Sequence, residues 1–149
     1  MGGITNFGKF AEALGPQGLG IRLAGLCDAA EAPYVARHLH RLRLGSAQTR
    51  EQAEALGFFV CEADLEDELV RALGTAAVER VLAREGDLDS FRRFEDQPAQ
   101  RGRGTCAQLR RFMGTRARRK IRYGSLLVNA LPPDRVPRAL AMVLGFHRG

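Results

Sequence analysis

The chain has 149 residues, of which 45% are hydrophobic and 27% are charged, and its formal net charge is +6. This is the length and composition of one globular domain, which excludes a largely disordered chain. The most apolar stretch, Val136 to Phe146, is too short to span a bilayer, and the first residues lack the basic start and apolar core of a signal peptide, so we expect a cytoplasmic protein that does not enter a membrane.

Residues 1–86 alternate between segments with helical spacing and short apolar runs. We expect helices over 3–14, with Thr5 or Asn6 as the cap, over 33–44, and over 49–56. Two further helices are expected, one opening at Glu62 with Leu65, Leu69 and Leu73 on one face, and one capped by Thr75. The runs 21–27 and 58–61 are mostly apolar without polar alternation, which indicates strands buried on both faces. The fold class that we predict is α/β, with a small parallel sheet and flanking helices.

Residues 87–149 read as a helical extension that packs on the same domain. A polar loop over 97–104 precedes a helix over 105–113 and a longer helix over 115–131. The inner face expected for the longer helix consists of Ala117, Ile121, Gly124, Val128 and Leu131. Asp134 is expected to start a last helix with Val136, Leu140 and Val143 facing inward. We therefore divide the chain into an α/β core over 1–86 and a basic helical extension over 87–149.

Acidic residues follow both predicted strands. Asp28 ends the first run, and Glu62, Asp64, Glu66, Asp67 and Glu68 come directly after the second. Ligands of open α/β sheets bind at the carboxyl ends of strands, where carboxylates would suit Mg²⁺ or Mn²⁺. The alternative is that Asp28 or Glu31 only caps the next helix.

Basic residues gather in the second part of the chain. Residues 1–91 hold 9 Lys and Arg against 14 Asp and Glu, whereas residues 92–122 hold 11 against 2. Few acids lie nearby in sequence to pair with this basic segment, so we expect it to bind nucleic-acid phosphates rather than to be only a solvated helix face. The candidate nucleic-acid-binding residues are Arg101, Arg103, Arg110, Arg111, Arg116, Arg118, Arg119, Lys120 and Arg122.

The positions of the cysteines and glycines indicate structural roles rather than catalytic or nucleotide-binding ones. Cys27 and Cys61 each end an apolar run, and we expect both to be buried, reduced thiols. Gly15, Gly18 and Gly20 precede a strand, whereas the dinucleotide fingerprint follows one, and no Walker lysine is present, so we expect no ATP site in this chain.

Four segments together resemble the Toprim domain of OLD-like (overcoming-lysogenization-defect) ATP-dependent endonucleases. They are Gly2-Gly3-Ile4-Thr5-Asn6, Leu23 to Asp28, Phe59 to Glu66, and Arg119-Lys120-Ile121-Arg122-Tyr123, in that order. The resemblance implies a Toprim-like fold that cleaves DNA with two divalent metals held by carboxylates. It also implies an ATPase domain as partner, in cis or in trans. A homo-oligomer is a further expectation.

The resemblance assigns roles to matching residues. Asp28 is similar to the first acid of the family's D-x-D, while Ala30 stands where the second acid is expected, and Glu31 is a candidate substitute. Glu66, with Asp64 beside it, resembles the acid of the D-L-E stretch, and Lys120 resembles a lysine that assists cleavage. The family's upstream strand with its glutamate has no counterpart here, so we expect an incomplete metal site.

The leading hypothesis is thus a Toprim-type, Mg²⁺- or Mn²⁺-dependent DNA endonuclease domain. Its metal ligands would be Asp28, Glu31, Asp64 and Glu66, with Lys120 and Glu66 as catalytic residues. The alternative is a catalytically inactive nucleic-acid-binding or assembly module.

Overall fold

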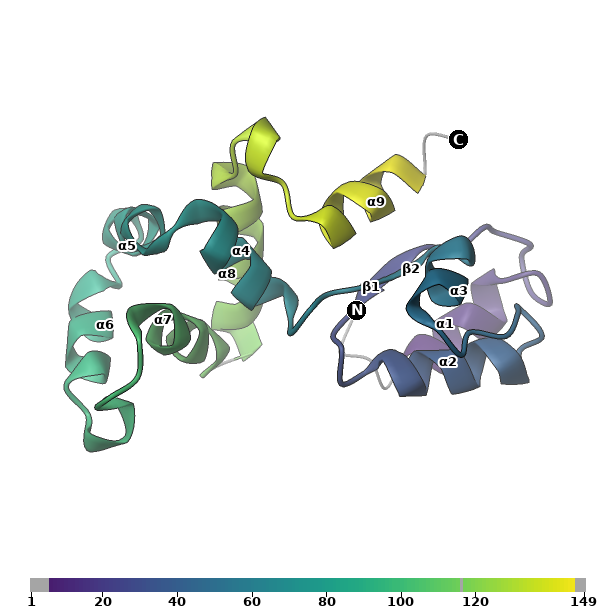
Figure 1. Cartoon of the computed structure of the whole chain (residues 1–149), viewed down its shortest axis with the longest axis horizontal. Coiled ribbons are helices and arrows are strands. Elements are labelled where there is room, and N and C mark those ends of the chain that lie inside the picture. Colours follow the sequence, from purple (N-terminus) through teal and green to yellow (C-terminus); the bar gives the residue numbers. More distant parts are fainter. Residues whose placement is uncertain (1–5, 116, 147–149) are drawn as a thin grey trace. The chain divides into compact units, whose positions relative to one another are not determined.

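The structure is a computed structural model that describes residues 6–115 and 117–146. The first elements are α1 (Phe7–Leu14), β1 (Gly25–Cys27), α2 (Ala32–Arg41), α3 (Arg50–Ala55) and β2 (Phe58–Val60) (Figure 1). They are followed by α4 (Leu65–Leu73), α5 (Thr75–Arg84), α6 (Leu88–Glu95), the 3₁₀ turn η2 (Pro98–Gln100), α7 (Thr105–Gly114), α8 (Ala117–Ala130), the 3₁₀ turn η3 (Pro133–Arg135) and α9 (Arg138–Phe146). In the described part of the chain no helix is long and apolar enough to span a membrane.

The chain forms two compact units. One, here called the sheet unit, combines the residues up to Asp64 with the C-terminal segment from Arg138, and the other, the helical unit, spans Leu65–Pro137. These units do not follow the division between residues 86 and 87 that the sequence suggested. The difference arises because α4 and α5 pack with α7 and α8, while α9 packs on the strands.

The sheet unit contains a parallel sheet of two strands, as the α/β prediction requires. Gly25, Leu26 and Cys27 pair with Phe58, Phe59 and Val60 respectively. The first strand is shorter than the predicted run 21–27, because β2 offers only three partners and Ile21 is exposed.

Alternation along the strands directs side chains to two different covers. On one side, Cys27 and Phe58 form a core cluster with Val35 and Leu39 of α2. On the other side, the Phe59 ring meets the Phe146 ring of α9 edge to face, with centroids 5.9 Å apart. The sheet is therefore buried on both faces, which explains why neither strand alternates with polar residues.

Gly57 has no side chain, and this leaves room for the Phe146 ring of α9. Its φ is +89°, a conformation that favours glycine, and a Cβ at this position would lie 2.7 Å from the Phe146 ring. The guanidinium of Arg22 lies over the same ring, 4.0 Å from the centroid. These contacts fix the end of α9 against the residue just before β2.

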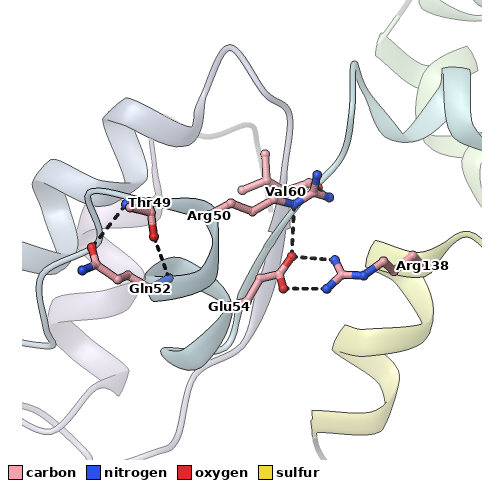
Figure 2. Close-up of polar contacts among 6 residues, drawn as sticks. All are labelled: Thr49, Arg50, Gln52, Glu54, Val60 and Arg138. Atoms are coloured by element: carbon pink, nitrogen blue, oxygen red, sulfur yellow. Dashed lines mark hydrogen bonds and ion pairs between the residues drawn. The ribbon is translucent and has the colours of Figure 1, made fainter.

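An ion pair fixes the beginning of α9. The Arg138 guanidinium donates to both carboxylate oxygens of Glu54, at 2.6 and 2.8 Å, and Arg50 donates to one of them at 3.1 Å (Figure 2). Glu54 lies on α3, whose start is held by a capping box between Thr49 and Gln52. The hydrogen bonds from Arg138 are the main reason why the pKa of the Glu54 carboxyl is about 2, below its ordinary value of 4.5.

The helical unit is built around a core that includes Leu69, Leu82, Phe91, Leu109 and Leu127. The inner face of α8 differs from the prediction. Ile121, expected inside, is 71% exposed, whereas Tyr123 and Leu127 are buried. The physical reason is that the buried Tyr123 hydroxyl donates to Asp87 at 2.7 Å, which an aliphatic face would not permit.

Several predicted boundaries shift by a few residues. Gly74, not Thr75, is the cap residue of α5, and Asn6 caps α1 without a side-chain hydrogen bond, while Thr5 lies outside the described residues. Asp134 falls in η3, and α9 starts only at Arg138, because Val136 is held extended by the proline that follows it. Cys27 and Cys61 are buried free thiols, as predicted.

We predict that Arg138→Met lowers the urea concentration at the midpoint of unfolding at pH 7, since the variant loses both hydrogen bonds to the Glu54 carboxylate. The Glu54 pKa is depressed in the folded state, so its contribution is fully present above pH 4.5 and is lost as the pH falls toward 2. Urea unfolding at pH 7 and pH 3 should therefore show a smaller difference between variant and parent at pH 3. Arg135→Met is the matched control, and an Arg138→Met effect equal to it at pH 7 would contradict the prediction.

Candidate functional site

The segments that follow the two strands stay side by side. Beyond the paired residues, the Cys61 amide donates to the Cys27 carbonyl at 3.0 Å, and the Ala29 amide donates to the Ala63 carbonyl at 3.2 Å. Asp28 and Asp64, both half-buried, therefore follow adjacent strands at one edge of the sheet, here called the strand-end edge. This is the placement that the sequence predicted for these two acids.

Glu31 takes part in the turn that begins α2. One of its carboxylate oxygens accepts a hydrogen bond from the Asp28 amide at 3.2 Å, and its own amide donates to the Asp28 carbonyl at 2.9 Å. Glu31 is the cap residue of α2, and Pro33 lies in the first turn. The sequence left open whether Asp28 or Glu31 caps the helix that follows, and in the structure the cap residue is Glu31.

The helical unit brings together the two residues predicted to be catalytic. Lys120 Nζ on α8 lies 3.5 Å from Glu66 Oε2 on α4. The Lys120 side chain is 51% exposed, whereas that of Glu66 is 11% exposed. Lys120 can therefore reach a ligand in solvent, while Glu66 holds its ammonium group.

A shared pocket for Asp28, Asp64 and Glu66 stays a prediction, because the first two belong to the sheet unit and the third to the helical unit. Over residues 6–115 and 117–146, no group of three or more His, Cys, Asp or Glu side chains is placed to hold a metal ion. Carboxylate oxygens suit Mg²⁺ and Mn²⁺ by their chemistry, but Glu31 is turned to the Asp28 amide.

Acids of the helical unit pair with part of the basic segment, contrary to the expectation that few would be near. Arg92 pairs with Glu79 at 2.6 Å and with Glu95 at 2.7 Å, and Arg122 pairs with Glu85. The pairs of Arg92 with Glu79 and of Arg122 with Glu85 join residues 13 and 37 positions apart, a distance over which sequence spacing gives no signal.

Arg119 is held by a small network rather than left to solvent. Its guanidinium lies 3.7 Å from Asp87 and 4.1 Å from the centroid of the Phe112 ring. Asp87 also accepts the hydrogen bond from Tyr123, whose pKa is raised mainly by burial and then by this bond. Sequence reasoning missed Tyr123 and Asp87, which fix α8 to the start of α6.

Several of the other candidate nucleic-acid-binding residues are exposed and could contact a phosphate. Within the described residues, we find no acidic partner for four exposed arginines, here called the open arginines: Arg101, Arg103, Arg111 and Arg118. Arg110 is exposed and has interactions of its own, and Arg116 lies outside the described residues. The helical unit as a whole holds 15 Lys and Arg against 10 Asp and Glu.

The chain matches no protein-family model, no curated protein and no solved structure.

Proposed function

We propose that this chain is part of a Toprim-type, divalent-metal-dependent DNA endonuclease, in which the strand-end edge supplies carboxylates and the helical unit contacts DNA phosphates. The observation that supports this most directly is the placement of Asp28 and Asp64 after two parallel strands that pair in register. Acids placed in this way are typical of the ligand-binding edge of open α/β sheets.

Two features of the helical unit support the DNA-binding part of the proposal. Its surplus of basic residues attracts a polyanion, and the open arginines are exposed. Lys120, half-exposed and beside Glu66, is in a position to contact a phosphate oxygen and to neutralise its charge. Arg119, Arg122 and Arg92 have a structural role first, because acids of the same unit already hold them.

A divalent metal, when bound, would activate water and stabilise the leaving oxygen. Asp28 and Asp64 at the strand-end edge would be among the ligands of that metal. The second candidate function is a nucleic-acid-binding or assembly module that does not cleave, which the surplus of basic residues in the helical unit supports equally well.

We predict that the chain binds duplex DNA without sequence preference and that the open arginines make most of the phosphate contacts. Neutralising about 4–6 phosphates gives a slope of the logarithm of affinity against the logarithm of salt near −4 to −5. Replacing the open arginines with Gln should flatten this slope by about 3 and weaken binding at least tenfold, as measured by fluorescence anisotropy. The matched control replaces four other exposed arginines with Gln, namely Arg37, Arg41, Arg43 and Arg80. Equal losses in the two variants would contradict the assignment.

We also predict that the chain nicks supercoiled plasmid only slowly with Mg²⁺ or Mn²⁺, because misplaced groups in such sites cost ~100-fold in rate. The residual nicking should disappear in Asp28→Asn and in Glu66→Gln, and should persist in the control Glu62→Gln. Nicking that survives both Asp28→Asn and Glu66→Gln would contradict the nuclease proposal. DNA binding without any nicking would favour the non-cleaving module.

A further inference from the structure

A cavity of about 510 Å³ opens in the sheet unit between α2, the start of α3 and the sheet. Its lining includes Cys27 and Val60, the last residues of the two strands, and Ala29 just beyond. The cavity therefore lies at the carboxyl ends of the strands, next to Asp28. Its volume falls in the range of roughly 300–1,000 Å³ in which small-molecule sites are found.

The walls of the cavity are small and apolar. Val35 and Ala36 of α2 face it from one side, Ala53 of α3 from another, and Phe58 contributes an aromatic ring. The ring of Phe58 is held edge to face by Phe7, with centroids 5.3 Å apart. A planar ligand with apolar faces suits these walls, since short side chains leave room for a ring beside them.

The polar groups of the cavity lie together, in the segment that begins α3. The Arg50 guanidinium donates to the Val60 carbonyl at 2.6 Å and to Glu54, and the Thr49 hydroxyl accepts from the Gln52 amide (Figure 2). Gln48 also lines the cavity and is exposed. A side-chain amide both donates and accepts, which matches the hydrogen-bonding edge of a heterocycle.

The charges around the cavity argue against an anionic ligand. Arg50, the one charged residue among the described lining residues, is already bound to Glu54 and to a carbonyl. Burial, together with the nearby carboxylates of Glu31 and Asp28, raises the pKa of the Cys27 thiol to about 11. A phosphate inside this cavity would find no available cation among the described lining residues, whereas a neutral ring needs none.

We propose that this cavity receives one unpaired nucleobase of a bound single-stranded DNA, with Phe58 and the small side chains against its face and Gln48 at its edge. The proposal rests on the proposed function for its source of nucleobases. Bases turned out of a stack are commonly held in this way, between apolar or aromatic side chains. The cavity would place this base next to Asp28 at the strand-end edge.

The test compares two fluorescein-labelled single-stranded 12-mers with the same number of phosphates, one carrying all its bases and one abasic at its central four positions. The parent chain should bind the complete 12-mer at least tenfold more tightly. Ala36→Leu, which fills the cavity, should bring the affinities for the two 12-mers within twofold of each other. If Ala36→Leu does not fold, Ala53→Leu fills the cavity from the other wall and should have the same effect. Ala55→Leu, on the exposed side of α3, is the matched control and should keep the difference.

Equal affinities for the two 12-mers, or a difference that survives in a folded cavity-filled variant, would overturn the inference while leaving DNA binding intact. If neither 12-mer binds, the chain does not bind single-stranded DNA, duplex binding is judged by its own titration, and the cavity is probed with free adenosine and thymidine by nuclear magnetic resonance. Shifts of the Val35 and Val60 methyl signals in the parent, absent from the filled variant, would uphold a nucleobase site. No shift at millimolar nucleoside would overturn it.

Discussion

A parallel sheet of two strands has two apolar faces, and both must be covered for the strands to stay paired in water. Here α1 and α2 cover the face that contains Cys27 and Phe58, and α9 covers the face that contains Phe59. The second cover comes from the end of the chain and is fastened at both ends of the helix, by the Arg138–Glu54 pair and by the Phe146 ring over Gly57. The pairing of the two strands therefore depends on α9, which the end of the chain supplies.

The candidate chemistry of the sheet unit is a consequence of that arrangement. With β1 and β2 held in register, the hydrogen bond from the Ala29 amide to the Ala63 carbonyl keeps Asp28 and Asp64 at one edge. The cavity beside this edge is bounded by the same strands and by α3, whose Glu54 also holds α9. A ligand at the strand ends would therefore be sensitive to changes far away in sequence, at Arg138 and Phe146.

Local patterns in the sequence were enough to predict most elements, because glycines, prolines and caps act on their neighbours. Both strands, the helix over Val35, Leu39 and Leu42, and the burial of Cys27 and Cys61 were predicted. Features that depend on partners distant in sequence were not predicted. The inner face of α8 follows from the bond between Tyr123 and Asp87, and the pairing of Arg92 and Arg122 follows from acids on other helices. For the same reason, the sequence could predict only a broad basic segment as the nucleic-acid-binding surface, and not which of its arginines pair with acids.

The most direct test of the account is amide hydrogen exchange in the sheet of a Phe146→Ala variant, read at the Gly25 and Cys61 amides that bond across the two strands. Removing the ring uncovers Phe59, so these amides should exchange at least tenfold faster than in the parent, while that of Leu127 in the helical unit keeps its rate. Met142→Ala, on the exposed side of α9, is the control. Unchanged exchange at Gly25 and Cys61 in Phe146→Ala would show that the sheet does not need α9 as its second cover.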